Sequence, residues 1–274
     1  MLLQSTVGPL RGGVVTSHPG VVGQSHGGAA AGQGDPWRSW VERLQTEWRT
    51  PIFYEIVSNE VAARSSTTRP TVLDIGCGRG FDGEARFQQA LAAQAGRFIG
   101  IEPDPTIDPP KVFSEVFRTT LEDAPLASGS VDVAYAIMVM EHVADPAAFW
   151  SRLYRVLAPG GVFVAFTVNG AHWFAPVTRF MSATNTKSRY LNLLRGRRGT
   201  ERYDDYPVYY RTNTPEQIMR VAKDFRSVKT LPFGATGTVA FYAPSRLRPL
   251  VRGVDRLAYR LRGQAINIMI RAER

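Results

Sequence analysis

The apolar residues of this chain form short runs that alternate with stretches of helical periodicity. Between several of these runs, apolar residues recur at the three- and four-residue spacing of one helix face, as at 85–92 and 146–157. Strands that alternate with helices predict an α/β domain. The runs expected to form strands are residues 71–75, 97–102, 115–119, 131–135, 162–166, 227–231 and 265–270.

The first 34 residues differ in composition from the rest of the chain. They contain nine glycines and little apolar periodicity, which predicts a disordered Gly-rich tail. A helix is expected from Asp35-Pro36, an N-cap followed by proline at the first helical position, and a second helix from Thr50-Pro51. One face of the first helix would carry Trp37, Trp40, Val41, Leu44 and Trp48.

The first strand leads directly into a loop with three alternating glycines, Gly76, Gly78 and Gly80. Glycine adopts backbone conformations closed to other residues and lets a ligand approach without a Cβ in the way. Because a helix pattern follows at once, its positive amino end would face whatever the loop holds. A dinucleotide-binding loop needs glycine at position 81, and this chain has Phe81 there.

The motif at residues 74–80, Asp-Ile-Gly-Cys-Gly-Arg-Gly, resembles the first motif of class I S-adenosylmethionine (SAM) methyltransferases. A second acidic position agrees with this resemblance. Glu102 ends the next strand, about 20 residues after the loop, where a carboxylate accepts hydrogen bonds from ribose hydroxyls. The alternative for Glu102 is a solvated carboxylate at a strand end.

The resemblance continues downstream and covers residues 71–168. Glu-His-Val-Ala-Asp-Pro at 141–146 and Leu-Ala-Pro-Gly-Gly at 157–161 match a small-molecule, type 11-like subgroup that includes the ubiquinone and menaquinone methyltransferases. The resemblance implies a Rossmann-like, doubly wound, mostly parallel seven-stranded sheet with an antiparallel edge strand. The methyltransferase domain would span residues 35–274, with helical insertions at about 171–212 and 233–263. Its leading helices would cover the cofactor, or would simply pack on the sheet.

The resemblance also implies which residues hold SAM. The glycine loop would hold the amino-acid end, with Asp74 near the ammonium group and Glu102 on the ribose. Residues 121–122 would flank the adenine, and residues 137–138 the sulfonium. Family members often have an acidic residue toward the adenine amino group, and this chain has Thr120 there, whose hydroxyl can still accept. The expected cofactor residues are Asp74, Gly76, Cys77, Gly78, Gly80, Glu102, Pro103, Thr120, Leu121, Glu122, Ile137 and Met138.

The sulfonium of SAM makes its methyl group electrophilic, so the main task of such a protein is to align a nucleophile. A hydroxyl acceptor often needs a base, and the candidates are His142, after the fourth strand, and His172, after the fifth. Tyr209 and Tyr210 are further candidates on the substrate side. The alternative for His142 is a helix-start histidine bonded to the backbone. A carbon or nitrogen nucleophile would need no base, and the acceptor itself stays open.

Charge is unevenly distributed along the chain. Residues 171–274 hold 20 Lys or Arg and 7 Asp or Glu, a balance of +13, which leaves −4 of the overall +9 for residues 1–170. Arginines interleaved with aromatic residues favour an acceptor with an apolar body and negative charge, such as a lipid, a prenylated quinone precursor or a lipid-linked saccharide. Residues 247–261 combine an apolar stripe with arginines on the opposite face. This composition is typical of an interfacial helix on anionic lipid, or of a surface helix packed on its own domain.

Other classes of function are disfavoured by composition. A single cysteine, Cys77, excludes a disulfide framework, a cysteine-cluster metal site and a radical SAM enzyme, and we interpret it as a packing residue. No signal peptide or spanning run of apolar residues is evident, which predicts a cytoplasmic protein, in solution or peripheral to a membrane. No nucleic-acid recognition motif is present.

The competing functions are a dehydrogenase, disfavoured by Phe81, and a non-catalytic scaffold that binds an anionic partner or membrane, disfavoured by the intact loop and Glu102.

Overall fold

The computed structural model describes most of the chain after the N-terminal segment. The described residues are 36–65, 68–78, 80, 81, 83–184, 186, 189, 190, 206–234, 236–263 and 265–274. The Gly-rich tail expected over residues 1–34 and the N-cap expected at Asp35 lie outside them.

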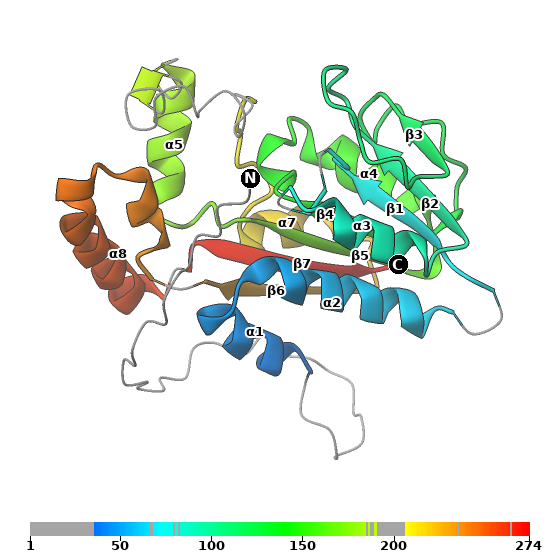
Figure 1. Cartoon of the computed structure of the whole chain (residues 1–274), viewed down its shortest axis with the longest axis horizontal. Coiled ribbons are helices and arrows are strands. Elements are labelled where there is room, and N and C mark those ends of the chain that lie inside the picture. Colours follow the sequence, from blue (N-terminus) through cyan, green and yellow to red (C-terminus); the bar gives the residue numbers. More distant parts are fainter. Residues whose placement is uncertain are drawn as a thin grey trace, which may run out of the picture. The chain divides into compact units, whose positions relative to one another are not determined.

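Seven strands form one sheet in the order β3-β2-β1-β4-β5-β7-β6 (Figure 1). The first five strands pair in parallel, whereas β7 is antiparallel to both β5 and β6. This confirms the predicted Rossmann-like sheet, and its one reversed strand lies between β5 and the edge strand β6. The bounds are β1 Thr71–Ile75, β2 Arg97–Ile101, β3 Glu115–Phe117, β4 Val131–Ile137, β5 Leu157–Val168, β6 Ser227–Phe233 and β7 Asn267–Glu273.

Helices cover both faces of the sheet. Successive strand residues point to opposite faces, so Val72 and Leu73 of β1 belong to two different hydrophobic clusters. The helices that pack with Val72 are α1 (Pro36–Thr46), α2 (Arg49–Ala63) and α3 (Ala85–Ala92); those with Leu73 are α4 (Pro146–Val156) and α7 (Pro215–Val221). The leading helices α1 and α2 therefore pack on the sheet. Their expected cover over a cofactor stays a prediction.

Local signals set the start of two of these helices. Asp145 caps α4, because its Oδ1 accepts a hydrogen bond from the Ala148 N–H at 3.1 Å. Thr214 and Gln217 form a reciprocal capping box at the start of α7. Both arrangements satisfy backbone N–H groups that the first helical turn leaves without partners.

The start of α2 differs from the sequence pattern. The pattern predicts a cap at Thr50, but α2 begins at Arg49, with Trp48 as the preceding residue. Thr50 is 2% exposed inside the first turn. Burial of this turn thus extends the helix by two residues before the proline-based start signal.

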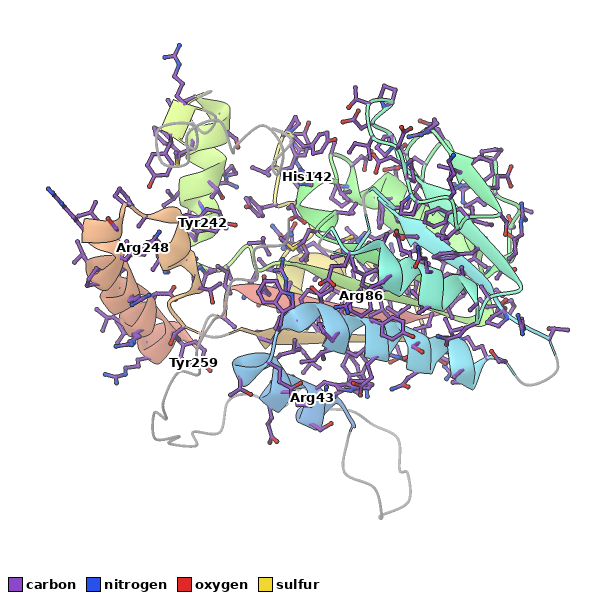
Figure 2. The ribbon with its side chains drawn as sticks, viewed as in Figure 1. Arg43, Arg86, His142, Tyr242, Arg248 and Tyr259 are labelled. Carbon is purple, nitrogen blue, oxygen red and sulfur yellow. The ribbon has the colours of Figure 1, made fainter. Side chains whose placement is uncertain are left out.

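The two insertions into the sheet lie on the left of Figure 1. The first follows β5 and contains α5, and the second joins β6 to β7 and contains α8. Figure 2 marks α8 with Arg248 and Tyr259, and η3 with Tyr242. The remaining short elements and insertion helices are η1 Met140–His142, α5 Phe174–Ala183, η3 Thr238–Tyr242, η4 Ser245–Leu247 and α8 Arg248–Arg262.

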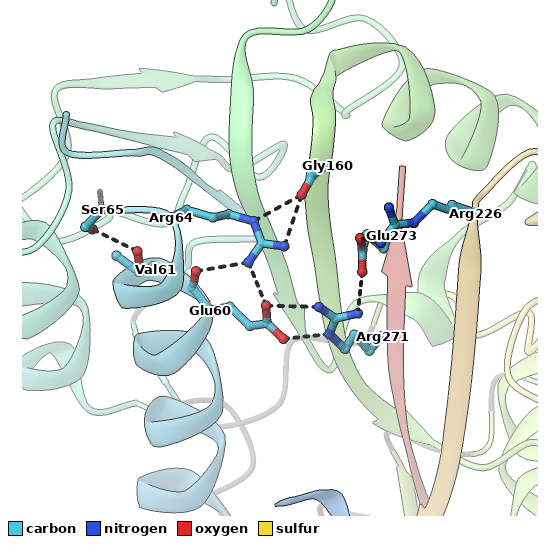
Figure 3. Close-up of polar contacts among 8 residues, drawn as sticks. All are labelled: Glu60, Val61, Arg64, Ser65, Gly160, Arg226, Arg271 and Glu273. Carbon is cyan, nitrogen blue, oxygen red and sulfur yellow. Dashed lines mark hydrogen bonds and ion pairs between the residues drawn. The ribbon is translucent and has the colours of Figure 1, made fainter. Parts of the chain in front are cut away.

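A charged network ties α2 to the sheet (Figure 3). The Glu60 carboxylate accepts from Arg271 of β7 at 2.6 Å and from Arg64 at 2.7 Å. Arg64 also donates to the carbonyl of Gly160, at 3.2 Å from Nε and 3.1 Å from Nη2. Burial alone would raise the pKa of Glu60, but the hydrogen bonds and charges of Arg271 and Arg64 outweigh it and hold that pKa below its ordinary value.

We predict that Glu60→Gln lowers the free energy of unfolding by about 2 kcal/mol, because Arg271 loses charge-assisted hydrogen bonds. Since folding lowers the pKa of Glu60, its contribution is complete above the unfolded value of 4.5 and is lost as pH falls through the folded value. Urea unfolding at neutral and acidic pH measures this. The control is Glu115→Gln, which removes a pair with Arg97 whose side chains are 42% and 50% exposed, and it should cost less than about 0.5 kcal/mol. Equal losses in both variants would contradict the prediction.

Candidate active site at the carboxyl edge of the sheet

The glycine loop after β1 is bonded to the end of β2. The backbone N–H groups of Gly76 and Cys77 both donate to the carbonyl of Ile101, at 2.8 and 2.9 Å. The Gly78 N–H donates to Oε2 of Glu102 at 2.9 Å. The ends of two neighbouring parallel strands therefore form one unit, at the edge where open α/β sheets bind ligands.

Close contacts explain the glycines at the two ends of the loop. A Cβ on Gly76 would lie 2.5 Å from Cγ2 of Val139, and Gly76 has a φ of +73°. A Cβ on Gly80 would lie 2.8 Å from the backbone nitrogen of Ala85, at a φ of +104°. Neither position accommodates a side chain, so these glycines let the loop pass close to the segment after β4 and the start of α3.

Gly78 differs because its surroundings are open. A Cβ there would have only the Glu102 carboxylate, at 3.4 Å, and the Gly76 carbonyl oxygen, at 3.6 Å, as neighbours within 4 Å. Both distances are ordinary van der Waals contacts, so among the described residues nothing clashes with a group at this point beside Glu102. This cradle fits a ligand that lies along the loop backbone and reaches the Glu102 carboxylate.

Glu102 is buried, with 6% of its surface exposed. Its Oε1 accepts from the Asp104 N–H at 3.0 Å and its Oε2 from the Gly78 N–H. Burial raises the pKa of Glu102, and these two backbone hydrogen bonds oppose the rise. Each carboxylate oxygen has a further lone pair, so the fixed carboxylate can also accept from a ligand hydroxyl.

Asp74 lies beneath the loop and is 3% exposed. Its Oδ2 accepts from Gln88 Nε2 and from the Tyr135 hydroxyl, both at 2.6 Å. Gln88 Nε2 also donates to the Cys77 carbonyl at 2.8 Å, so it bridges Asp74 to the loop. The sequence pattern missed Gln88 and Tyr135. A contact between Asp74 and a cofactor ammonium stays a prediction.

Cys77 packs inside the loop and is 1% exposed. Burial raises the pKa of its thiol, followed by the charges of Asp74 and Glu102, so the neutral thiol dominates. Gly100 of β2 makes this packing possible, because a Cβ there would lie 2.7 Å from Cys77 Sγ. This agrees with a packing role for Cys77, and Gly100 is a loop-supporting residue that the sequence pattern did not reveal.

The segment after β4 lies next to the loop through the Gly76–Val139 approach. Met138 has a φ of +55°, and its N–H donates to the Phe166 carbonyl at 2.7 Å. Arg49, at the start of α2, has Nη1 4.0 Å from Met138 Sδ. A cationic side chain therefore lies at the end of β4, beside a residue expected to flank the sulfonium.

The residues expected near the adenine follow β3 along the same edge. Leu121 is 2% exposed and belongs to the core, whereas Thr120 and Pro103 are exposed and Glu122 is half-buried. Thr120 Oγ1 donates to Asp123 Oδ2 at 3.5 Å. Strand β3, which precedes residues 120–122, lies next to β2, which ends just before Glu102.

Comparison with known proteins agrees with this geometry. Residues 73–165 match the family model described as a methyltransferase domain. An uncharacterized methyltransferase of Mycobacterium sp. (strain KMS) is 32% identical over 160 residues, which cover 50% of this chain and 60% of that protein. A probable S-adenosylmethionine-dependent methyltransferase of Mycolicibacterium smegmatis is 33% identical over 127 residues, 44% of each chain. Residues 73–165 of this chain are therefore similar to the domain of SAM-dependent methyltransferases.

The chain spans about half the length of these two curated relatives. A SAM-dependent methyltransferase of Archaeoglobus fulgidus, solved by crystallography, has the same fold, with a TM-score of 0.51 at 14% identity. That match covers 88% of this chain and all of the other. Among the described residues, no helix has the length and apolarity needed to cross a membrane.

The two histidine candidates of the methyltransferase domain have different hydrogen bonds. His142, in η1 after β4 (Figure 2), has Nδ1 2.7 Å from the carbonyl oxygen of Pro207. A carbonyl only accepts, so Nδ1 carries the proton and Nε2 is left with its lone pair. His142 is half-buried at the edge of the sheet, and Nε2 is the atom that can take up a proton.

His172 is 2% exposed, and both of its ring nitrogens are engaged. Nδ1 accepts from the Phe174 N–H at 3.3 Å, and Nε2 donates to Asp255 Oδ1 at 3.0 Å. Burial lowers the pKa of His172, although Asp255 opposes this. These contacts join the first insertion to α8 and favour a positioning role, and a catalytic role stays a prediction.

Residues 206–213, here called the edge segment, run along the carboxyl edge of the sheet. The Tyr206 hydroxyl donates to the Asp104 carboxylate, next to Glu102, and the Tyr209 N–H donates to the Glu141 carbonyl at 2.8 Å. The Tyr210 hydroxyl lies 2.9 Å from Thr178 Oγ1, and burial raises its pKa. The edge segment therefore spans the ends of β2, β4 and β5, and these contacts have no signal in the sequence.

We predict a pH-dependent stability that comes from Asp74. Burial raises the pKa of its carboxyl to about 7, while the hydrogen bonds from Tyr135 and Gln88 oppose the rise. Between the unfolded value of 3.8 and about 7, Asp74 keeps its proton in the folded protein but not in the unfolded protein. The free energy of unfolding therefore falls as pH rises toward 7. The slope is up to about 1.4 kcal/mol per pH unit. In Asp74→Asn the amide oxygen still accepts, but this slope should disappear. Urea unfolding from pH 5 to 8 measures the difference, and parallel profiles would contradict the assignment.

Proposed function

We propose that this chain transfers the methyl group of SAM to a small-molecule or lipid-like acceptor. The observation that carries the proposal is the bond between the Gly78 N–H and the Glu102 carboxylate beside an open cradle. When bound, SAM supplies an electrophilic methyl group. The protein contributes alignment of the acceptor with that methyl, which is worth several kcal/mol of barrier reduction.

The residues of the carboxyl edge then have separate tasks. The loop at residues 76–80 holds the amino-acid end of SAM through its backbone, with the amino end of α3 behind it. Glu102 accepts from the ribose hydroxyls, residues 120–122 flank the adenine, and residues 137–138 flank the sulfonium. Asp74 acts through Gln88, which fixes the Cys77 carbonyl and hence the shape of the loop.

The charge and apolar character of the region favour an acceptor with an apolar body and a negative group. Arg49 provides a guanidinium at the end of β4, where an acceptor must approach the methyl group. Beyond the edge segment, the insertions carry exposed arginines and exposed apolar side chains. A lipid, a prenylated quinone precursor or a lipid-linked saccharide has this combination, and such an acceptor would bring the protein to a membrane surface.

The geometry of Phe81 bears on the dehydrogenase alternative. Phe81 occupies the position at which a dinucleotide loop has its third glycine. It is 1% exposed and packs against Phe53 and Tyr135, with ring centroids 5.9 and 5.3 Å apart. A core side chain at this position supports the shorter loop of the methyltransferases. The non-catalytic scaffold remains the alternative that loss of SAM binding would favour.

We predict that Glu102→Gln weakens SAM binding at least about tenfold, because a charge-assisted hydrogen bond to the ribose is lost. Gly78→Val should weaken it further, since its side chain enters the cradle. Calorimetric titration with SAM, S-adenosylhomocysteine and NAD measures binding, and we expect none for NAD.

Matched controls exist for both changes. Glu115→Gln alters an exposed carboxylate on the neighbouring strand. Gly129→Ala alters a glycine that also has positive φ, +67°, with nothing within 4 Å. Both controls should retain wild-type affinity for SAM. Undiminished binding in the Glu102 and Gly78 variants would remove the assignment of this site.

We predict that His142→Asn lowers the turnover of an oxygen acceptor about 10²- to 10⁴-fold, the usual contribution of a general base. Asparagine keeps a donor toward the Pro207 carbonyl but takes up no proton. SAM affinity should be unchanged. The acceptor for this assay is the metabolite that differs by one methyl between a deletion strain and its parent. Unaltered turnover would show that His142 only holds the edge segment.

A further inference from the structure

Helix α8 is held to the domain by one face. Asp255 is 2% exposed, and its Oδ1 accepts from Trp173 Nε1 at 2.8 Å and from His172 Nε2 at 3.0 Å. Its Oδ2 accepts from the Gly237 N–H. Asp255 is the only acidic residue of α8. The one acidic side chain of this helix therefore points inward, and three hydrogen-bond donors of the domain bind its carboxylate.

The opposite face of α8 exposes large apolar side chains to solvent. Leu250, Val254, Leu257 and Leu261 are 66%, 45%, 57% and 75% exposed. At about 100° per residue, these four positions fall on one stripe that points away from Asp255. Scattered exposed leucines are ordinary on protein surfaces, but a continuous stripe along a whole helix marks an interaction site.

The rest of the exposed surface of α8 is basic. Arg252, Arg256 and Arg260 are exposed and lie one turn apart, on the side of the helix away from the apolar stripe. Because Asp255 is buried, the outward surface of α8 has positive charge with no negative charge of its own. An apolar stripe on one side of a helix and arginines on the other, strongly polar side are the pattern of helices that lie in a membrane interface.

The position of α8 connects this surface to the candidate active site. Asn267, the first residue of β7, pairs with Phe233, the last residue of β6, and with Val168, the last residue of β5. The insertion that contains α8 therefore emerges at the carboxyl edge of the sheet, and the glycine loop after β1 and His142 after β4 follow their strands at this same edge.

Helix α5 emerges at the same edge and contacts the same insertion. It follows β5 and contacts the insertion through the rings of Phe174 and Tyr242, whose centroids are 5.3 Å apart. On α5, Phe180 is 69% exposed and Val177 is 43% exposed. The apolar surface thus extends beyond α8 along this edge.

We propose that α8 docks the protein on an anionic bilayer, with its leucine stripe in the interface and its arginines on acidic headgroups. The choice of occupant follows from charge complementarity, since the arginine stripe disfavours a second copy of the same basic surface. Docking would let the acceptor reach the active site from the bilayer, and this consequence rests on the proposed function. Docking itself is a property of α8.

Vesicle flotation with the full chain tests the proposal. Wild-type protein should bind vesicles of phosphatidylcholine with phosphatidylglycerol at least about tenfold more tightly than vesicles of phosphatidylcholine alone, and raised salt should weaken this binding. The triple variant Leu250→Asn, Leu257→Asn, Leu261→Asn should lose at least about tenfold in affinity. The variant Arg252→Gln, Arg256→Gln, Arg260→Gln should lose about a hundredfold on anionic vesicles.

The controls are Met219→Asn, at a 54% exposed position of α7, and Arg220→Gln, also exposed on α7. Both should bind vesicles like the wild type. All variants change exposed side chains, so their unfolding midpoints and SAM titrations should match the wild type. Vesicle binding that is absent, or equal for neutral and anionic lipid, would overturn the inference. A second result would also overturn it: wild-type protein that binds no vesicles and sediments as a dimer, with the leucine variant sedimenting as a monomer. If the wild-type protein binds vesicles as expected but shows no binding of SAM in the titration, the proposed function is overturned and the docking inference is not.

Discussion

The bonds between the loop after β1 and the end of β2 are the interaction on which the candidate active site depends. Two loop N–H groups share the Ile101 carbonyl, and a third binds the Glu102 carboxylate. These bonds hold the acidic side chain against the loop backbone without a ligand. A ligand that binds both groups finds them already in position, so little conformational entropy of the loop is lost on binding. From beneath, the Gln88 amide joins Asp74 to the Cys77 carbonyl and prevents the loop from collapsing.

Much of the fold was predictable because local pattern and tertiary packing agree. Strand runs of period two and helices of period 3.6 place alternate residues in two cores, and the caps at Asp145 and Thr214 act within four residues. The start of α2 was off by two residues because burial of Thr50 outweighs the local signal. The nearness of the loop to Glu102 could also be predicted, since their spacing follows from one strand–loop–helix–strand unit, and their roles toward a cofactor stay predictions. Their supports were missed, because Gln88, Gly100 and Tyr135 act through contacts between different elements.

The two histidines show a limit of sequence pattern at the catalytic end of the site. Both follow a strand at the carboxyl edge, and both carry the same chemistry in isolation. Their partners separate them, because a carbonyl acceptor on Nδ1 of His142 leaves Nε2 basic, whereas His172 has a donor on one nitrogen and a carboxylate on the other. The partner of His142 is Pro207, 65 residues away in sequence. Spacing alone therefore cannot identify the base.

The second insertion shows how this fold gains a surface without disturbing its core. β6 and β7 pair along their whole length, with Phe233 directly opposite Asn267, so the chain leaves and re-enters the sheet at neighbouring positions. Extending a loop whose ends are already close costs little conformational entropy, because the cost grows only with the logarithm of its length. The insertion then needs one anchor, and Asp255 provides it by binding His172, Trp173 and Gly237. With that anchor on the inner face, the outer face of α8 has no packing task in the described domain. Its exposed leucines and the arginines at 252, 256 and 260 are therefore available for a contact outside the domain.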